Sequence, residues 1–233
     1  MRWFKCRKFT NSHRLLLSKL KSVKEIDVSN TDFNDKDFTR LKNIKGLEEL
    51  NLSETKVKNL NINALKSLKE LKSINLSKTA VSDQAIKNLQ YCPELEHVDI
   101  ESTKIKVVPE IELWQKIKSL NLSNCNLTRG NTIKSKTLED LYIRELKIEY
   151  LALDTPKLES INYGLRFKGE IRISSDLKYM NSMSFSYRKI SPADVKLISH
   201  LPNLKELYFS DCDLSILKTL GERQKLESLF INT

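Results

Sequence analysis

One line of sequence recurs along the whole chain, most cleanly between Leu71 and Val81 as LKSINLSKTAV. Apolar residues occupy positions 1, 4, 6 and 11 of this unit, and a small polar residue occupies position 9. Ten copies can be followed, and their first residues lie 20 to 24 residues apart, at Val23, Leu47, Leu71, Leu95, Ile117, Leu138, Leu158, Met180, Leu204 and Leu226. Positions 4 and 6 carry apolar or aromatic residues in every copy. A fixed period of this length indicates that one supersecondary unit is stacked on copies of itself.

The repeated line resembles the unit of the leucine-rich-repeat family, LxxLxLxx(N/C/T)xL, and the resemblance covers nearly the whole chain. It implies an α/β solenoid with a curved parallel sheet on the concave side and short helices or 3₁₀ turns on the convex side. Positions 3 to 7 would form a strand, so that positions 4 and 6 face the core while positions 3, 5 and 7 face outward. The resemblance also implies a non-enzymatic scaffold that holds a protein partner against the concave sheet.

The sequence predicts one solenoid domain, with an N-terminal cap in residues 1–22 and about ten repeats in residues 23–233. Phe4 lies 22 residues before Ile26, which predicts a cap strand, and residues 10–12 can begin a helix that runs to Leu20. The alternative is a basic membrane-binding peptide that carries Trp3, Phe4 and Phe9. At the other end the chain stops just after the tenth predicted strand, so we expect either an exposed core edge or a natural protein that continues.

The segments between the strands differ along the chain. Helix-start residues predict helices near 34–41, 82–89 and 191–198, the last with Pro192 at its first position. Around 107–109 and 150–156 we expect extended chain or 3₁₀ turns, because repeats of 20 to 22 residues leave little room for a helix. Position 9 loses its small polar residue at Leu146, Arg166 and Arg188, which predicts a distorted middle-to-late region. That region is either degenerate or a place where a partner docks.

The charge of the chain is strongly basic overall but not on the predicted concave face. A net charge of +10 initially favours nucleic acid or an anionic membrane surface as the partner. However, positions 3, 5, 7 and 8 of the ten repeats carry ten carboxylates and only two basic residues, Lys78 and Arg144. A protein that gripped phosphates there would need the opposite charge. We therefore predict a partner with a basic contact surface, and binding of nucleic acid or an anionic surface to the basic convex face is the alternative.

The predicted partner-binding residues combine the acidic positions with aromatic and Arg residues, which are common interface anchors. They are Asp99, Glu101, Asp140, Tyr142, Arg144, Glu145, Tyr187, Tyr208, Asp211 and Phe230. Within this set, Tyr142, Arg144, Tyr187, Tyr208 and Phe230 are the predicted hot spots. Trp114, Phe167 and Phe185 are predicted to fill core or convex positions.

Catalytic and cofactor motifs are sparse. His97 and Asp99 share one predicted strand face with Ser73 and Ser119 on the neighbouring strands, but an open sheet face offers no oxyanion hole, so we expect no enzyme activity. Four distant cysteines, scattered glycines and clustered carboxylates without a calcium loop predict neither a metal nor a cofactor.

No signal peptide or membrane span is predicted, so a reducing cytoplasm is the expected compartment, with secretion by a signal-less route left open. Two biological settings fit the sequence. One is a bacterial effector, or an immunity protein that blocks a basic enzyme, and the other is a module of a larger complex.

Overall fold

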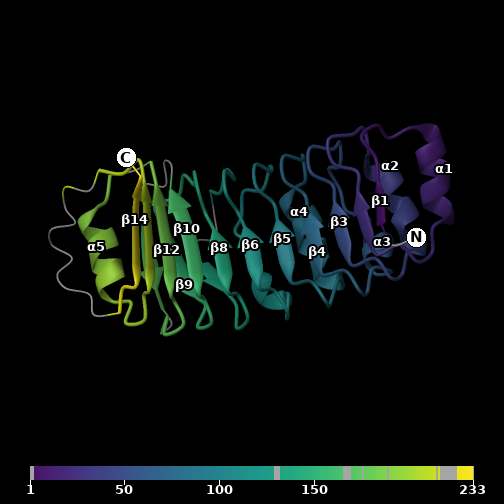
Figure 1. The fold of residues 1–233 in the computed structure, drawn as a ribbon. Coiled ribbons are helices and arrows are strands. Elements are labelled where there is room, and N and C mark those ends of the chain that lie inside the picture. The colour runs from purple at the N-terminus through teal and green to yellow at the C-terminus, as the bar shows by residue number, and fades with distance from the viewer. Residues whose placement is uncertain are drawn as a thin grey trace.

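The computed structural model describes residues 3–128, 132–164, 169–174, 176–187, 189–213, 215 and 225–232. Eleven parallel strands form its main sheet and lie side by side from the N-terminal to the C-terminal end (Figure 1). In spatial order they are β1 (Trp3–Lys5), β2 (Glu25–Asp27), β3 (Glu49–Asn51), β4 (Ser73–Asn75), β5 (His97–Asp99), β6 (Ser119–Asn121), β8 (Asp140–Tyr142), β10 (Ser160–Gly164), β12 (Ser182–Ser186), β13 (Glu206–Ser210) and β14 (Ser228–Asn232). The predicted parallel sheet is confirmed.

The register of the sheet follows the sequence repeat. Leu50 of β3 lies opposite Ile26 on one side and opposite Ile74 on the other, so that position 4 of each repeat pairs with position 4 of the next. Position 4 and position 6 side chains are buried in the first nine repeats, as at Ile74 and Leu76, which are 1% and 0% exposed. In the tenth repeat the corresponding Leu229 and Ile231 are 51% and 50% exposed. The two apolar columns of the sequence therefore form one continuous core behind the sheet. Trp114 and Phe185 are also buried, as predicted, while Phe167 lies outside the described residues.

The three helices predicted between strands are present, although two of them continue as 3₁₀ turns. The described helices are α1 (Asn11–Lys19), α2 (Asp35–Phe38) with η1 (Thr39–Asn43), α3 (Ile62–Leu65), α4 (Asp83–Lys87) with η2 (Asn88–Tyr91), η3 (Ile111–Leu113) and α5 (Pro192–Ser199). Helix α3 was not predicted, although Asn61 caps it by accepting the backbone N–H of Ala64 at 3.0 Å. None of these helices has the length and apolarity needed to cross a bilayer.

A second, smaller parallel sheet lies on the convex side. It has the order β11–β9–β7 and consists of β7 (Thr132–Lys134), β9 (Tyr150–Asp154) and β11 (Glu170–Ile173). Extended chain or a 3₁₀ turn was predicted near 150–156, and the structure has extended chain there; its pairing with neighbouring repeats was not predicted. In repeats too short for a helix, pairing between return segments satisfies the backbone polar groups.

Within the described residues, the region predicted to be distorted differs from the earlier repeats mainly on the convex side, and its strands β10 and β12 lengthen to five residues. The main sheet runs through it without interruption, from β6 through β8 and β10 to β12. Leu146 is fully buried at position 9, while Arg166 and Arg188 lie outside the described residues. The loss of the polar residue at Leu146 is therefore accommodated by apolar packing.

The N-terminal residues extend the main sheet by one strand. Phe4 of β1 lies opposite Ile26 of β2, the register that the 22-residue spacing predicts, and Thr10 is the N-cap of α1. Phe4 and Phe9 are buried, so of the three aromatics in the membrane-peptide alternative only Trp3 is exposed. The division into a cap of residues 1–22 and repeats from residue 23 remains a prediction, as do both alternatives for the C-terminal edge.

Candidate protein-binding face

The concave face, defined here as positions 3, 5, 7 and 8 of the repeats, has a structural ladder in its first half. At position 5 of the first five repeats, one side-chain oxygen accepts the backbone N–H two residues further on, at 2.9 to 3.1 Å; the residues are Asp27, Asn51, Asn75, Asp99 and Asn121. This local hydrogen bond forms an Asx turn that ends the strand. The hydrogen bonds of these side chains therefore serve the turn, even though the side chains lie on the face that a partner would contact.

The backbone after these turns is left-handed. Position 8 has a positive φ, between 51° and 59°, in each of the first nine repeats whose position 8 the structure describes. The residues are Asn30, Glu54, Lys78, Ser102, Asn124, Glu145, Tyr187 and Asp211. The sequence offers no glycine at these positions to reveal this conformation. The available signal was weak, because Asn, the non-glycine residue that tolerates it best, occurs only at Asn30 and Asn124.

Position 9 closes the turn. The hydroxyls of Thr31, Thr55, Thr79 and Thr103 each donate to the carbonyl three residues earlier, at 2.6 to 2.8 Å. The small polar residue of the repeat pattern therefore stabilises the turn that follows each of these strands.

A ladder of alternating charges at position 2 was missed from the sequence. Glu48 pairs with Lys24 on one side and with Lys72 on the other, at 3.0 Å from the Lys72 Nζ, and Lys118 pairs with Glu96 at 2.7 Å. The period was visible, but positions 2 of successive repeats become neighbours only once the strands are in register. Hydrogen bonds from Lys24 and Lys72 lower the pKa of Glu48 from 4.5 to about 2.

We expect this ladder to give a pH dependence in acid. Because the folded pKa of Glu48 is depressed, its contribution to stability is complete above about pH 4.5 and is lost as the pH falls toward 2. Replacing Lys72 with Gln should raise the Glu48 midpoint in a carboxyl-carbon NMR titration. Lys116→Gln, which removes the partner of Glu94 instead, should leave that midpoint unchanged. Equal midpoints in all three proteins would contradict the ladder.

Three of the predicted binding residues meet in the middle of the concave face. Asp99, Tyr142 and Arg144 line a shallow depression of about 350 Å³ over β4, β5, β6 and β8. Asn121 lies opposite Asp99 on one side and opposite Tyr142 on the other, so the three position-5 side chains stand on adjacent strands. Glu101 borders the same place, because its Oε2 accepts the Asn121 side-chain amide at 3.2 Å.

Among the described residues, four carboxylates in or next to this depression have no ion pair, whereas two carboxylates toward the N-terminus do. Toward the N-terminus, Lys5 neutralises Asp27 at 2.6 Å and Lys78 neutralises Glu54 at 2.8 Å. In contrast, no ion pair within the described part of the chain involves Asp99, Glu101, Asp140 or Glu145. Burial is the main cause that raises the pKa of Asp99, with the nearby Glu101 charge adding to it. A cation would relieve this unfavourable environment.

The remaining predicted residues form a separate group near the C-terminal end. The rings of Tyr208 and Phe230 stack with centroids 4.6 Å apart, and the Tyr208 hydroxyl donates to Glu206 at 3.0 Å. Asp211 occupies the left-handed turn of the repeat that contains Tyr208, and Tyr187 occupies the left-handed turn of the repeat before it. Three strand spacings separate β8 from β13, roughly 14 Å. The single predicted cluster is therefore two groups on one face.

The residues that resemble a catalytic constellation are aligned but not connected. His97 lies opposite Ser73 and Ser119, yet among the described residues no hydrogen bond joins the imidazole to either serine or to Asp99. The four cysteines are free thiols. The described residues also contain no group of three or more His, Cys, Asp or Glu side chains arranged to hold a metal.

Known proteins resemble this chain in structure. No protein-family model matches the sequence, and no curated protein does. The APL1 leucine-rich repeat domain superposes with a TM-score of 0.67 at 13% identity, over 97% of this chain and 59% of that one. TLR13 from a TLR13–ssRNA13 complex superposes with a TM-score of 0.62 at 18% identity, over 82% of this chain and 29% of that one.

A leucine-rich-repeat protein of Leptospira interrogans gives a TM-score of 0.56 at 20% identity, over 93% of this chain and 62% of that protein. The chain thus spans less than two thirds of the length of each of these structures. At these identities the likeness concerns the fold. Together with the repeat register and the parallel sheet, it establishes that this chain folds as a leucine-rich-repeat solenoid.

Proposed function

We propose that this chain is a non-enzymatic scaffold that binds a protein partner with a basic contact surface on its concave face. The observation that carries this proposal is a group of four carboxylates without ion pairs in the described part of the chain. Asp99 and Glu101 lie at the central depression, and Asp140 and Glu145 lie on the adjoining strand β8 and in the turn that follows it. Complementary potentials steer docking and reject wrong partners. Tyr142 and Arg144 in the same depression would supply the anchors.

The backbone at Tyr187 supports an interface role for the C-terminal group. Its φ is 51°, a conformation that is a genuine outlier for a bulky residue, and 57% of the residue is exposed. A large aromatic residue here gains little from burial in the free protein. Strained positions are frequent at binding sites, where their cost is offset by function.

Replacing Tyr187 with Asn is therefore expected to stabilise the free protein by about 1 kcal/mol, because Asn tolerates the left-handed conformation better. The same change should weaken partner binding. Asn124→Tyr, at the equivalent position of an earlier repeat, should lower stability by a similar amount. Urea denaturation of the parent protein and the two variants measures both changes in stability. A loss of stability in Tyr187→Asn would contradict the proposed strain.

The charge proposal can be tested with binders selected from an unbiased displayed peptide library. A variant with Asp99→Asn, Glu101→Gln, Asp140→Asn and Glu145→Asn removes four charges while it keeps the hydrogen-bond acceptors at positions 99 and 101. A control with Glu70→Gln, Glu112→Gln, Glu149→Gln and Asp176→Asn makes the same charge change on exposed residues outside the concave face.

We expect the selected peptides to be rich in Lys and Arg, and their affinity to fall at least tenfold, roughly 1.4 kcal/mol, in the concave variant alone. Peptides without basic residues, or equal losses in both variants, would contradict the proposal.

Binding of nucleic acid or an anionic surface to the basic convex face is the second candidate. The chain carries 40 Lys and Arg residues, few of them on the concave face, and one structural neighbour is part of a complex with single-stranded RNA. Single-stranded RNA bound equally by both variants, with a steep salt dependence, would favour it. The cytoplasm, a bacterial effector or immunity role, and membership of a larger complex remain predictions.

A further inference from the structure

We propose that a pocket on the convex side binds a small molecule with a single aromatic ring. The pocket has a volume of about 170 Å³ and lies between α4 and the segment that leads through η3 to Trp114. Its inner wall includes the buried side chains of Ile86, Ile105 and Trp114. Its mouth is open, because Val107 and Leu113 are 38% and 44% exposed there.

The size and chemistry of the pocket determine which ligand it suits. An enclosed apolar cavity of about 150 Å³ accepts benzene. This pocket has a similar volume and an apolar inner wall, although its mouth is open. Of the two carboxylates at the edge of this pocket, that of Asp83 is already engaged, since its Oδ1 accepts the backbone N–H groups of Lys106 at 2.8 Å and Val107 at 3.1 Å. A flat apolar ring can therefore enter the pocket without breaking the hydrogen bonds of the Asp83 carboxylate.

The rim adds a requirement for the rest of the ligand. Gln84, Lys87 and Glu110 line the outer part of the pocket, so a polar substituent on the ring would point toward the mouth and keep its hydrogen bonds. The pocket lies on the opposite side of the solenoid from the concave face. Its occupation is thus independent of the proposed protein partner.

The pocket contains its own reporter. The chain has two tryptophans, so a Trp3→Phe variant leaves Trp114 as the single tryptophan fluorophore and the single indole N–H signal. Benzyl alcohol, a ring with one hydroxyl group, is titrated into this variant. We expect a saturable change in Trp114 fluorescence and in its indole N–H chemical shift, with methyl shifts confined to residues such as Ile86 and Ile105. A shift that stays linear up to the solubility limit would overturn the proposal.

Substitution at the mouth separates this site from unspecific apolar binding. Leu113→Asp places a charge beside the ring, and we expect binding of benzyl alcohol to weaken about tenfold. Leu16→Asp is the matched control, because Leu16 is 40% exposed on α1, far from the pocket. Equal weakening in both variants, or none in Leu113→Asp, would overturn the proposal. If Leu113→Asp does not fold, the methyl-shift map of the Trp3→Phe variant decides alone.

Discussion

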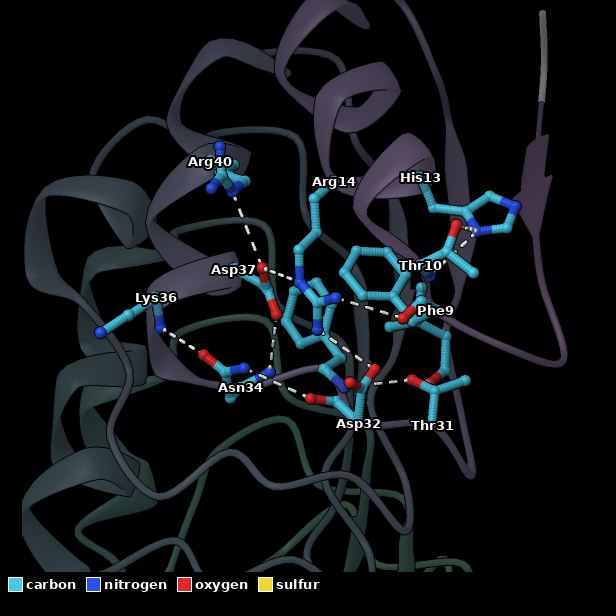
Figure 2. A network of polar contacts seen from close by, with 12 residues as sticks. Phe9, Thr10, His13, Arg14, Thr31, Asp32, Asn34, Lys36, Asp37 and Arg40 are labelled. Atoms are coloured by element: carbon cyan, nitrogen blue, oxygen red, sulfur yellow. Dashed lines mark hydrogen bonds and ion pairs between the residues drawn. The ribbon is translucent and has the colours of Figure 1, made fainter.

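Replacing Asp37 with Ala is expected to destabilise the N-terminal end of the solenoid by about 3 kcal/mol. The Asp37 carboxylate is 2% exposed and receives the Arg14 Nε–H at 2.9 Å, while the Arg40 guanidinium lies 3.7 Å away (Figure 2). Its second oxygen accepts the backbone N–H of Asn34 at 3.3 Å. Alanine would remove the carboxylate that both guanidinium groups face and leave Arg14 with Asp32 alone. Removing one partner of a buried ion pair is strongly destabilising.

The same network attaches α1 to the first repeat, which contains both Asp32 and Asp37. Arg14 also donates to the carbonyl of Phe9 at 3.3 Å and packs over the Phe9 ring at 4.9 Å, so the loss of Asp37 should loosen the helix as a unit. Amide hydrogen exchange should show faster exchange in α1 and β1. Asp32→Ala is the control, because Asp32 is 50% exposed, pairs with Arg14 at 3.1 Å and should cost about 1 kcal/mol or less. Equal losses for the two variants would contradict this interpretation.

Replacing Gly164 with Ala is expected to cost about 3 kcal/mol, because β10 and β12 approach too closely for a side chain. A Cβ at this position would lie 2.7 Å from both the Cβ and the carbonyl oxygen of Ser186, its partner in the register. Backbone cannot yield as the end of a flexible side chain can. The strand pair would have to separate at the point where the sheet joins the central depression to the C-terminal aromatic group.

Gly46 offers the matched control for this substitution. A Cβ there meets no atom within 4 Å, so Gly46→Ala should change the free energy of unfolding by less than about 1 kcal/mol. Chemical denaturation of both variants beside the parent protein gives the comparison. A Gly164→Ala protein as stable as Gly46→Ala would show that the two strands are farther apart than described.

The sequence was sufficient to predict the main sheet because its period is set by the core. Each position 4 side chain must lie against its equivalents, so the spacing between Phe4 and Ile26 predicted a pairing that the structure confirms. Helix-start residues were equally informative, since Ser191 and Pro192 begin α5 as expected. These signals are local, or they repeat often enough to be read without the fold.

The features missed from the sequence depend on contacts between repeats or on backbone conformation. The second sheet needs three return segments to meet, and no residue in β9 by itself indicates a partner strand. The hydroxyl of Tyr163, 0% exposed, donates to Asp194 of α5 at 2.8 Å, across 31 residues of sequence. The left-handed turn at Tyr187 carries no glycine that would reveal it.

The candidate site was predicted in composition but not in arrangement. Asp99, Tyr142 and Arg144 do meet, because they follow from the register. Tyr208 and Phe230 form their own stack several strands away. Which carboxylates stay unpaired depended on lysine side chains such as Lys5 and Lys78, whose reach to Asp27 and Glu54 no pattern specifies.

The central claim concerns which face the partner covers, and hydroxyl-radical footprinting of the chain with a selected basic peptide tests it most directly. Tyr187 on the concave face and Tyr179 in a return segment are 57% and 48% exposed, so they oxidise from a comparable starting point. We predict that the peptide protects Tyr142 and Tyr187 and leaves Tyr179 unchanged. Protection of Tyr179 with unchanged oxidation of Tyr142 and Tyr187 would contradict binding on the acidic concave face.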